Sequence, residues 1–148
     1  MDRIDKKILS IINKSIPISE RPFLAVAETM GMSEAEVLDR LKKLKTSGII
    51  RRIGATINPR TIGWNSTLCA ADVAMDRIEE FAEFIDRYNE VTHNYLREGY
   101  PNCWFTLIAP SSDRISEIIS EIEHALNIKI INLPARKVFK IRVALEIE

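Results

Sequence analysis

The segment at residues 33–46 combines the spacing of a helix with an unusual order of charges. It reads S-E-A-E-V-L-D-R-L-K-K-L-K-T, so Glu34, Glu36 and Asp39 fall in the first turns. Two shorter helices are predicted before it, over residues 2–13 and 23–30. Three helices in this order predict a helix-turn-helix unit, in which the first turns of the third helix normally face DNA and its phosphates. Because this helix begins with acids, we do not expect nucleic acid to be a partner.

The sequence also marks where this first unit turns and ends. Gly31 ends the second helix and Ser33 caps the third. Residues 49–58 alternate in the manner of a short β wing with N-P-R as its turn, and residues 63–65 (G-W-N) form a linker. We therefore predict a winged helix-turn-helix domain over residues 1–62.

The rest of the chain alternates strand and helix patterns. Strands are predicted over residues 66–74, 91–97 and 103–109, helices over 76–88 and 112–126, and one or two further strands over 128–148 around Pro134. The order β-α-β-β-α-β is that of the ferredoxin-like split motif. The fold class is therefore α+β, with a ferredoxin-like domain over residues 63–148. Small helix-on-sheet domains leave sheet faces and edges uncovered, so we expect the chain to pair with a second chain.

Composition excludes several classes of partner. The chain of 148 residues carries 21 basic and 21 acidic side chains, so no net field attracts nucleic acid or an anionic membrane surface. No apolar run approaches the roughly 20 residues that span a bilayer, and the first residues, M-D-R-I-D-K-K, lack the apolar core of a secretion signal. We expect a cytoplasmic protein with no membrane partner, in which any anion site is local.

The two cysteines, Cys69 and Cys103, fit neither a disulfide framework nor a CxxC metal motif. Both lie in apolar runs typical of strands, which indicates inert thiols in the core. A shared role as metal ligands would need neighbouring strands, and His93 or His124 to complete the set. The core interpretation is the better supported.

A polar strand carries the strongest candidate site. If the stretch T-H-N-Y-L-R forms a strand, alternation places His93, Tyr95 and Arg97 on one face together with Val91. An imidazole, a phenol and a guanidinium are costly in a simple core. In a cleft they supply a general acid or metal ligand, a hydrogen-bond donor and an anion anchor. Trp104 on the next strand could stack on a flat ligand or fill the core.

Two basic segments could hold carboxylates. Arg51, Arg52 and Arg60 put guanidinium groups, planar forks suited to carboxylate or phosphate, in and beside the predicted wing. Near the C-terminus, Arg136 and Lys140 are candidates within the stretch R-K-V-F-K-I-R-V. Both segments could instead be solvent-exposed basic edges without a ligand. Wings of DNA-binding proteins often carry Arg that contacts the DNA backbone, and edge strands often carry Lys, which prevents pairing with other chains.

With these features in place, the chain resembles the family of leucine-responsive and AsnC-type regulators, which join a helix-turn-helix to a ferredoxin-like ligand-sensing domain. The likeness runs nearly end to end, and the acidic third helix agrees with a branch that is enzymatic and needs no DNA. That branch is the siroheme decarboxylases, of which the chain resembles the A-type subunit more than the B-type. Five stretches carry this resemblance: R-R-I-G-A from Arg51, S-T-L-C-A-A from Ser66, T-H-N-Y-L-R from Thr92, N-C-W-F-T-L from Asn102 and L-P-A-R-K-V-F-K-I-R-V from Leu133.

The resemblance implies a carboxy-lyase of alternative haem biosynthesis. Its reaction would remove the acetate carboxyls on rings C and D of siroheme, at C12 and C18, to give 12,18-didecarboxysiroheme. The family works as pairs of related subunits, so siroheme and a paralogous subunit, or a second copy of this chain, are the expected partners. No added cofactor is required, and the metal involved is the iron of the substrate.

The resemblance also suggests roles for the candidate residues. His93 would be the proton donor or an axial ligand to the substrate iron, and Tyr95 would be a supporting donor. The remaining candidates would bind the substrate, with cations on its carboxylates and an indole on its macrocycle: Arg51, Arg52, Arg97, Arg136, Lys140 and Trp104.

One position departs from the branch pattern. A second histidine often follows two residues after the Arg of the H-N-Y-x-R stretch, whereas this chain has Gly99 there and Pro101 inserted after Tyr100. If that histidine is needed, this subunit supplies part of the active site and its partner supplies the rest.

Two other interpretations stay open at this point. An AsnC-type regulator would bind duplex DNA with an affinity that falls steeply as salt rises. A haem-binding sensor or carrier would bind a tetrapyrrole without changing its mass.

Overall fold

The computed structural model describes residues 1–138, 145 and 147, which form two compact units. Residues 1–55 with 145 and 147 make up the first unit, and residues 56–138 make up the second. The division falls earlier than the boundary at residue 62 that the sequence suggests, because η1 (Pro59–Ile62) packs against the first strand of the second unit. No helix among the described residues is long and apolar enough to cross a membrane.

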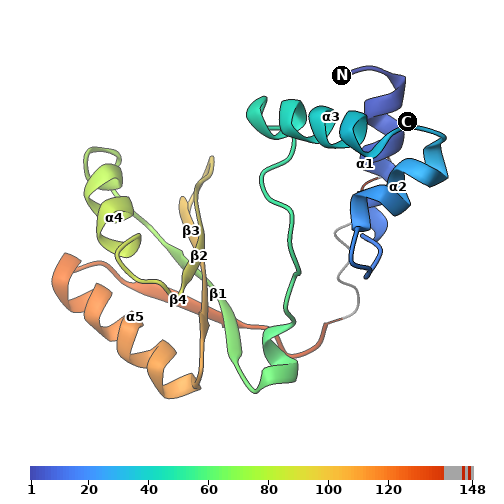
Figure 1. Ribbon diagram of the computed structural model, residues 1–148. Coiled ribbons are helices and arrows are strands. Elements are labelled where there is room, and N and C mark those ends of the chain that lie inside the picture. Colours follow the sequence, from blue (N-terminus) through green and yellow to red (C-terminus); the bar gives the residue numbers. More distant parts are fainter. Residues whose placement is uncertain (139–144, 146, 148) are drawn as a thin grey trace. The chain divides into compact units, whose positions relative to one another are not determined.

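The first unit contains three helices, α1 (Arg3–Lys14), α2 (Pro22–Met30) and α3 (Glu34–Thr46), as Figure 1 shows. Local signals set their ends: Asp2 caps α1, Gly31 ends α2 in the left-handed conformation, and Ser33 caps α3. The helix-turn-helix prediction is therefore confirmed. Apolar side chains from all three helices form the core: Ile8, Leu9, Val26, Ala27, Val37, Leu41 and Leu44.

The predicted wing is wrong. Residues 49–58 contain no strand, and the N-P-R sequence starts a helix instead of turning a hairpin. The Asn58 side chain accepts a hydrogen bond from the Arg60 N–H, and Pro59 stands at the first helical position, where its missing N–H is no loss. A cap and a proline in this order favour the short helix η1 over a turn between strands.

The second unit is a four-stranded antiparallel sheet with two helices, and the prediction of a ferredoxin-like β-α-β-β-α-β order is confirmed. The strands lie in the order β2-β3-β1-β4, and one strand is found in the described part of the predicted region 128–148. The elements are β1 (Asn65–Ala71), η2 (Met75–Arg77), α4 (Ile78–Ile85), β2 (Val91–Leu96), β3 (Cys103–Ala109), α5 (Ser112–Leu126) and β4 (Ile130–Pro134).

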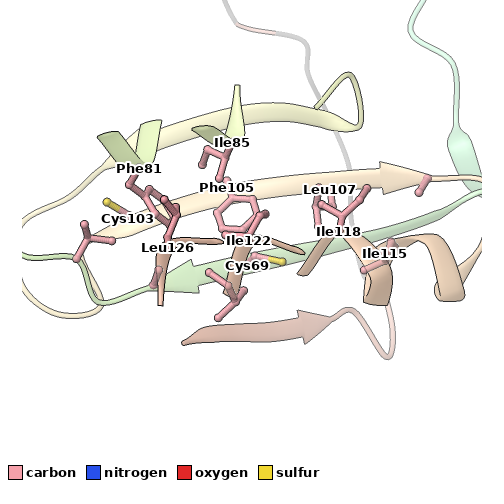
Figure 2. Close-up of a cluster of buried hydrophobic side chains, with 14 residues drawn as sticks. Cys69, Phe81, Ile85, Cys103, Phe105, Leu107, Ile115, Ile118, Ile122 and Leu126 are labelled. Atoms are coloured by element: carbon pink, nitrogen blue, oxygen red, sulfur yellow. The ribbon is translucent and has the colours of Figure 1, made fainter. Parts of the chain in front are cut away.

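Both helices pack against the same face of this sheet. Figure 2 shows Phe81 and Ile85 of α4 and the isoleucines of α5 gathered around Phe105 and Leu107 of β3. Phe81 and Phe105 meet edge to face, with ring centroids 6.1 Å apart. Cys69 and Cys103 are part of this core, as predicted, and burial raises the pKa of the Cys69 thiol to about 12. A thiol with so high a pKa is an inert apolar side chain at neutral pH.

We expect Asn102→Ala to destabilise the second unit. The Asn102 side chain is 3% exposed, accepts from the Val73 N–H at 2.9 Å and donates to the Val73 carbonyl at 2.7 Å. Its removal leaves two buried backbone groups unpaired at about 1–3 kcal/mol each, so the free energy of unfolding should fall by about 2 kcal/mol or more. Urea unfolding followed by tryptophan fluorescence measures this, because Trp64 and Trp104 both belong to the second unit.

Asn94→Ala is the matched control, since within the described residues the Asn94 side chain makes one hydrogen bond, to the Asp86 carboxylate at 3.1 Å. We expect a change within about 0.5 kcal/mol for that variant. Equal unfolding midpoints for the Asn102 and Asn94 variants would contradict the prediction.

Acid should loosen the first unit through Asp2. The Asp5 N–H and the Arg40 guanidinium lower the pKa of Asp2 from 3.8 to about 2. A carboxyl whose pKa is lower in the folded state stabilises that state above pH 3.8, and this contribution is lost as the pH falls through about 2. In Asp2→Asn the cap stays but carries no charge, so its loss of helical circular dichroism between pH 4 and 2 should be shallower than that of the unmodified protein. Superimposable pH curves for the two proteins would count against this assignment.

Candidate functional site

The side chains of strand β3 alternate between the two faces of the sheet. Cys103, Phe105, Leu107 and Ala109 are buried on the helical side, and the intervening residues point to the opposite side, which we call the open face. The pairing of β3 with its neighbours carries this alternation across the sheet. Two rows of open-face residues result: Leu133, Leu68, Thr106 and His93 in one, and Ile131, Ala70, Trp104 and Tyr95 in the other.

A β-bulge turns His93 onto the open face. Val91 pairs with Leu107 of the core face, whereas His93 pairs with Thr106 of the open face, so Thr92 is an extra residue in β2. The expectation that Val91 and His93 share a face is therefore wrong. Without the bulge, alternation would place the imidazole on the same side as Val91, which packs against the core.

His93 and Tyr95 form a stacked pair on this face. Their ring centroids lie 5.9 Å apart with an angle of 25° between the planes. His93 Nδ1 lies 3.1 Å from the Thr92 hydroxyl, and the Tyr95 side chain is half exposed. An imidazole and a phenol thus stand together within reach of a ligand that lies on the sheet.

Arg97 and Trp104 form a second pair beside the first. The Arg97 guanidinium carbon lies 5.7 Å from the centre of the indole, within the range of a cation–π contact. The indole N–H donates to the Pro101 carbonyl at 2.7 Å. The backbone N–H of Arg97 donates to the backbone carbonyl of Asn102, also at 2.7 Å. No carboxylate in the described part of the chain forms an ion pair with Arg97. The guanidinium is therefore held in place with its N–H donors available to an anion.

The other predicted site residues belong to other segments of the chain. Arg51 and Arg52 belong to the first unit, and both are exposed; Arg52 donates to the Ala55 carbonyl at 3.3 Å. Arg136 is exposed just after β4 in the second unit. Lys140 lies outside the described residues. The structure therefore brings His93, Tyr95, Arg97 and Trp104 together.

Sequence reasoning missed the end of the β2–β3 hairpin. A hollow of about 400 Å³ lies there, lined by Leu96, Arg97, Tyr100 and Asn102 among others. It also missed that Thr92 and Pro101 hold the polar ends of His93 and Trp104. The polar residues Thr92, Arg97 and Asn102, in and after β2, indicate a site in this region. Their hydrogen-bond partners depend on the bulge and on the loop conformation, which the sequence does not specify.

Charged side chains of α3 form ion pairs both within the helix and with residues that precede it. Arg40 contacts Asp2 at 2.7 Å and Asp5 at 2.8 Å, and Lys43 contacts Asp39 at 2.7 Å. Arg21 pairs with Glu34 at the start of the helix. Arg40, Lys43 and Arg21 are thus engaged with carboxylates, which lowers the positive charge that this region would offer to phosphates.

Comparison with known proteins identifies both halves of the chain. The siroheme decarboxylase NirDL-like HTH domain matches residues 5–51, and the AsnC-like ligand binding domain matches residues 61–140. The siroheme decarboxylase alpha subunit of Desulfovibrio desulfuricans is 46% identical over 97% of this chain and 83% of its own length. The siroheme decarboxylase NirD subunit of Pseudomonas aeruginosa is 36% identical over 100% of this chain and 98% of its own length.

Solved structures agree in fold. The siroheme decarboxylase NirDL is 31% identical with a TM-score of 0.72, over 95% of this chain and 46% of that one. The same enzyme in complex with an iron-uroporphyrin III analogue gives a TM-score of 0.70 over 90% of this chain and 46% of that one. An AsnC family regulator from Agrobacterium tumefaciens has a TM-score of 0.79 at 21% identity, covers 98% of this chain and 96% of its own, and shows the fold alone. The chain thus belongs to the siroheme decarboxylase subunits, a family built on the AsnC fold.

Proposed function

We propose that this chain is a subunit of a siroheme decarboxylase, a carboxy-lyase that removes the acetate carboxyls at C12 and C18 of siroheme to give 12,18-didecarboxysiroheme. Near full-length similarity to siroheme decarboxylase subunits supports the activity. The observation that carries the proposal is the open face, where a proton carrier, a phenol and a carboxylate anchor lie around the half-buried indole of Trp104.

The open face suits a flat, carboxylate-rich iron tetrapyrrole. Its β1–β4 half presents Leu68, Ile131 and Leu133, each more than two-fifths exposed, to the apolar macrocycle. Its β2–β3 half presents Trp104 for stacking and Arg97 for a peripheral carboxylate. The related NirDL was solved with an iron-uroporphyrin III analogue, a ligand of the same shape class.

The chemistry needs a proton donor and an electron sink. Protonation of the pyrrole ring draws the electrons of the C–C bond into the ring as carbon dioxide leaves. The remaining exocyclic carbon then takes up a proton to become a methyl group, and the ring releases the proton that it had gained. Each acetate thus takes up one proton and releases one carbon dioxide. His93 supplies either this proton or an axial bond to the substrate iron, because one nitrogen does not do both at once, and Tyr95 supports it.

Contacts with cations determine which carboxylates of the substrate are retained. A carboxylate held by Arg is stabilised as the anion, whereas an acetate placed against apolar side chains is destabilised and favours the neutral product. We assign the holding role to Arg97 and also to Arg51, Arg52, Arg136 and Lys140. No cofactor beyond the substrate iron is needed for this sequence of steps.

We further propose a paralogous subunit as the partner, in a heterodimer or larger assembly, with a homo-oligomer as the alternative. The relatives are named as alpha and NirD subunits, which supports a divided enzyme. The chain matches 43% of the NirDL subunit of Paracoccus denitrificans, so that protein is long enough to contain a second unit of this size.

A DNA-binding regulator is the second candidate, favoured by the fold shared with AsnC regulators. The ion pairs on α3 weigh against it, since Arg40, Lys43 and Arg21 are held by carboxylates. A non-catalytic haem sensor is the third candidate, because the open face binds in the same way whether or not chemistry follows.

Replacing His93 should separate these candidates. Anaerobic incubation with siroheme, with and without a paralogous subunit, followed by mass spectrometry should show loss of two carbon dioxide units for the unmodified protein. We expect His93→Ala to lower the rate about a hundredfold or more, the usual value of a positioned proton donor. His124→Ala is the control, because His124 is exposed on α5, on the helical side of the sheet. Bound but unchanged siroheme in every mixture would favour the sensor.

Replacing Arg97 should weaken siroheme binding more than turnover. Loss of a charge-assisted hydrogen bond of about 1.5–3 kcal/mol predicts a Kd for Arg97→Ala that is roughly tenfold or more above that of the unmodified protein. Arg87→Ala is the matched control. The Arg87 guanidinium carbon also lies over an aromatic ring, 5.3 Å from the centre of Phe84, but that ring belongs to α4 and not to the open face. Absorbance titration with siroheme gives the Kd, and equal values for the two variants would remove Arg97 from the site.

A further inference from the structure

We propose that Thr92 is a positioning residue that holds the neutral His93 imidazole in the tautomer with hydrogen on Nδ1, which leaves Nε2 as the nitrogen available to the substrate. The inference rests on the proposed function for its catalytic meaning. The tautomer itself is a property of the free protein.

The first support is the place of Thr92 in the strand. Thr92 is the residue that the bulge inserts between Val91 and His93. Its insertion turns the imidazole to the open face and brings the Thr92 hydroxyl to the same ring, with Oγ1 3.1 Å from Nδ1. Bulges of this kind commonly redirect one side chain beside a functional site.

The second support is the way in which hydrogen atoms can be shared among the Thr92 hydroxyl, the Thr106 carbonyl oxygen and His93 Nδ1. The Thr92 hydroxyl also faces the carbonyl oxygen of Thr106 at 3.5 Å, at the long limit of a hydrogen bond. A carbonyl oxygen can only accept, so the hydroxyl hydrogen satisfies it by pointing there. The hydroxyl oxygen is then an acceptor toward Nδ1, and Nδ1 must be the donor. The opposite tautomer would take the hydroxyl hydrogen from the carbonyl.

The consequence is a single reactive nitrogen. With Nδ1–H engaged by Thr92, the lone pair of the neutral ring lies on Nε2, and the added proton of the charged ring lies there too. Both roles considered for His93, proton donor and axial ligand, then use Nε2. Histidines that act as ligands or bases are commonly oriented in this way by a hydrogen bond to their other nitrogen.

The direct test is nitrogen NMR of protein labelled with 15N-histidine, in the absence of any tetrapyrrole and at a pH at which both imidazoles are neutral. The chain has two histidines, so His124→Gln identifies the His93 signals. We expect protonated Nδ1 and unprotonated Nε2 in the unmodified protein. Thr92→Val keeps the branched shape suited to a strand but removes the hydroxyl, and should move His93 toward the Nε2–H form; Thr92→Ser should restore the original pattern.

Turnover gives the second readout. We expect Thr92→Val to lower kcat about tenfold to a hundredfold, the usual effect of removing a group that orients a histidine, with KM nearly unchanged. Thr92→Ser should recover most of kcat. Ser116→Ala is the control, because it removes an exposed hydroxyl that also donates to a backbone carbonyl, that of Ser112, but lies on α5 on the helical side of the sheet.

An Nε2–H tautomer in the unmodified protein, or an unchanged tautomer in Thr92→Val, would overturn the proposal. A loss of kcat in Thr92→Val that Thr92→Ser does not repair would also count against it. Absence of decarboxylation by the unmodified protein would overturn the proposed function instead, and the NMR result would still decide the tautomer.

Discussion

Burial of one side of β3 is the constraint on which the candidate site depends. Phe105 and Leu107 are fully buried against α4 and α5, which fixes the register of the strand, because a slip by one residue would expose both. The same alternation forces Trp104 and Thr106 to the open face, and pairing passes the arrangement to β1, β2 and β4. The hydrophobic core thus sets which polar and aromatic groups face a ligand.

The first unit keeps a DNA-binding frame while its charges are rearranged. Arg40 of α3 bridges the Asp2 and Asp5 carboxylates at the start of α1, so its charge is paired within the unit. The two carboxylates raise the pKa of Arg40. The pKa values of Asp2 and Asp5 are lowered first by the backbone N–H groups of the capping box and then by Arg40. A helix-turn-helix fold can keep its helix caps and apolar core without a DNA-binding surface, since core packing and surface charge depend on different residues.

Periodicity predicted the fold and part of the site. The alternating runs at β1 and β3 and the apolar stripes of α4 and α5 were enough for the ferredoxin-like order, because each reflects burial of one face. The bulge at Thr92 could not be predicted, since an inserted residue leaves no mark in a six-residue strand. The wing failed because Asn58 and Pro59 suit a helix start as well as a turn, and the choice depends on packing against β1. The bonds from Trp104 to Pro101 and from Asn102 to Val73 join segments through loop geometry, which a sequence pattern does not specify.

The hairpin between β2 and β3 accounts for the departure at Gly99 from the pattern that the resemblance implies. Gly99 stands where that pattern would place a second histidine, and its φ is 84°, a conformation that side chains other than glycine adopt only with strain. A histidine there would strain the turn that brings the Asn102 carbonyl to the Arg97 N–H. Among the described residues of the second unit, His93 is therefore the imidazole on the open face, since His124 lies on α5. If the chemistry uses two imidazoles, the second must come from another chain, which gives the proposed pairing of subunits a chemical reason beyond the covering of an apolar sheet face.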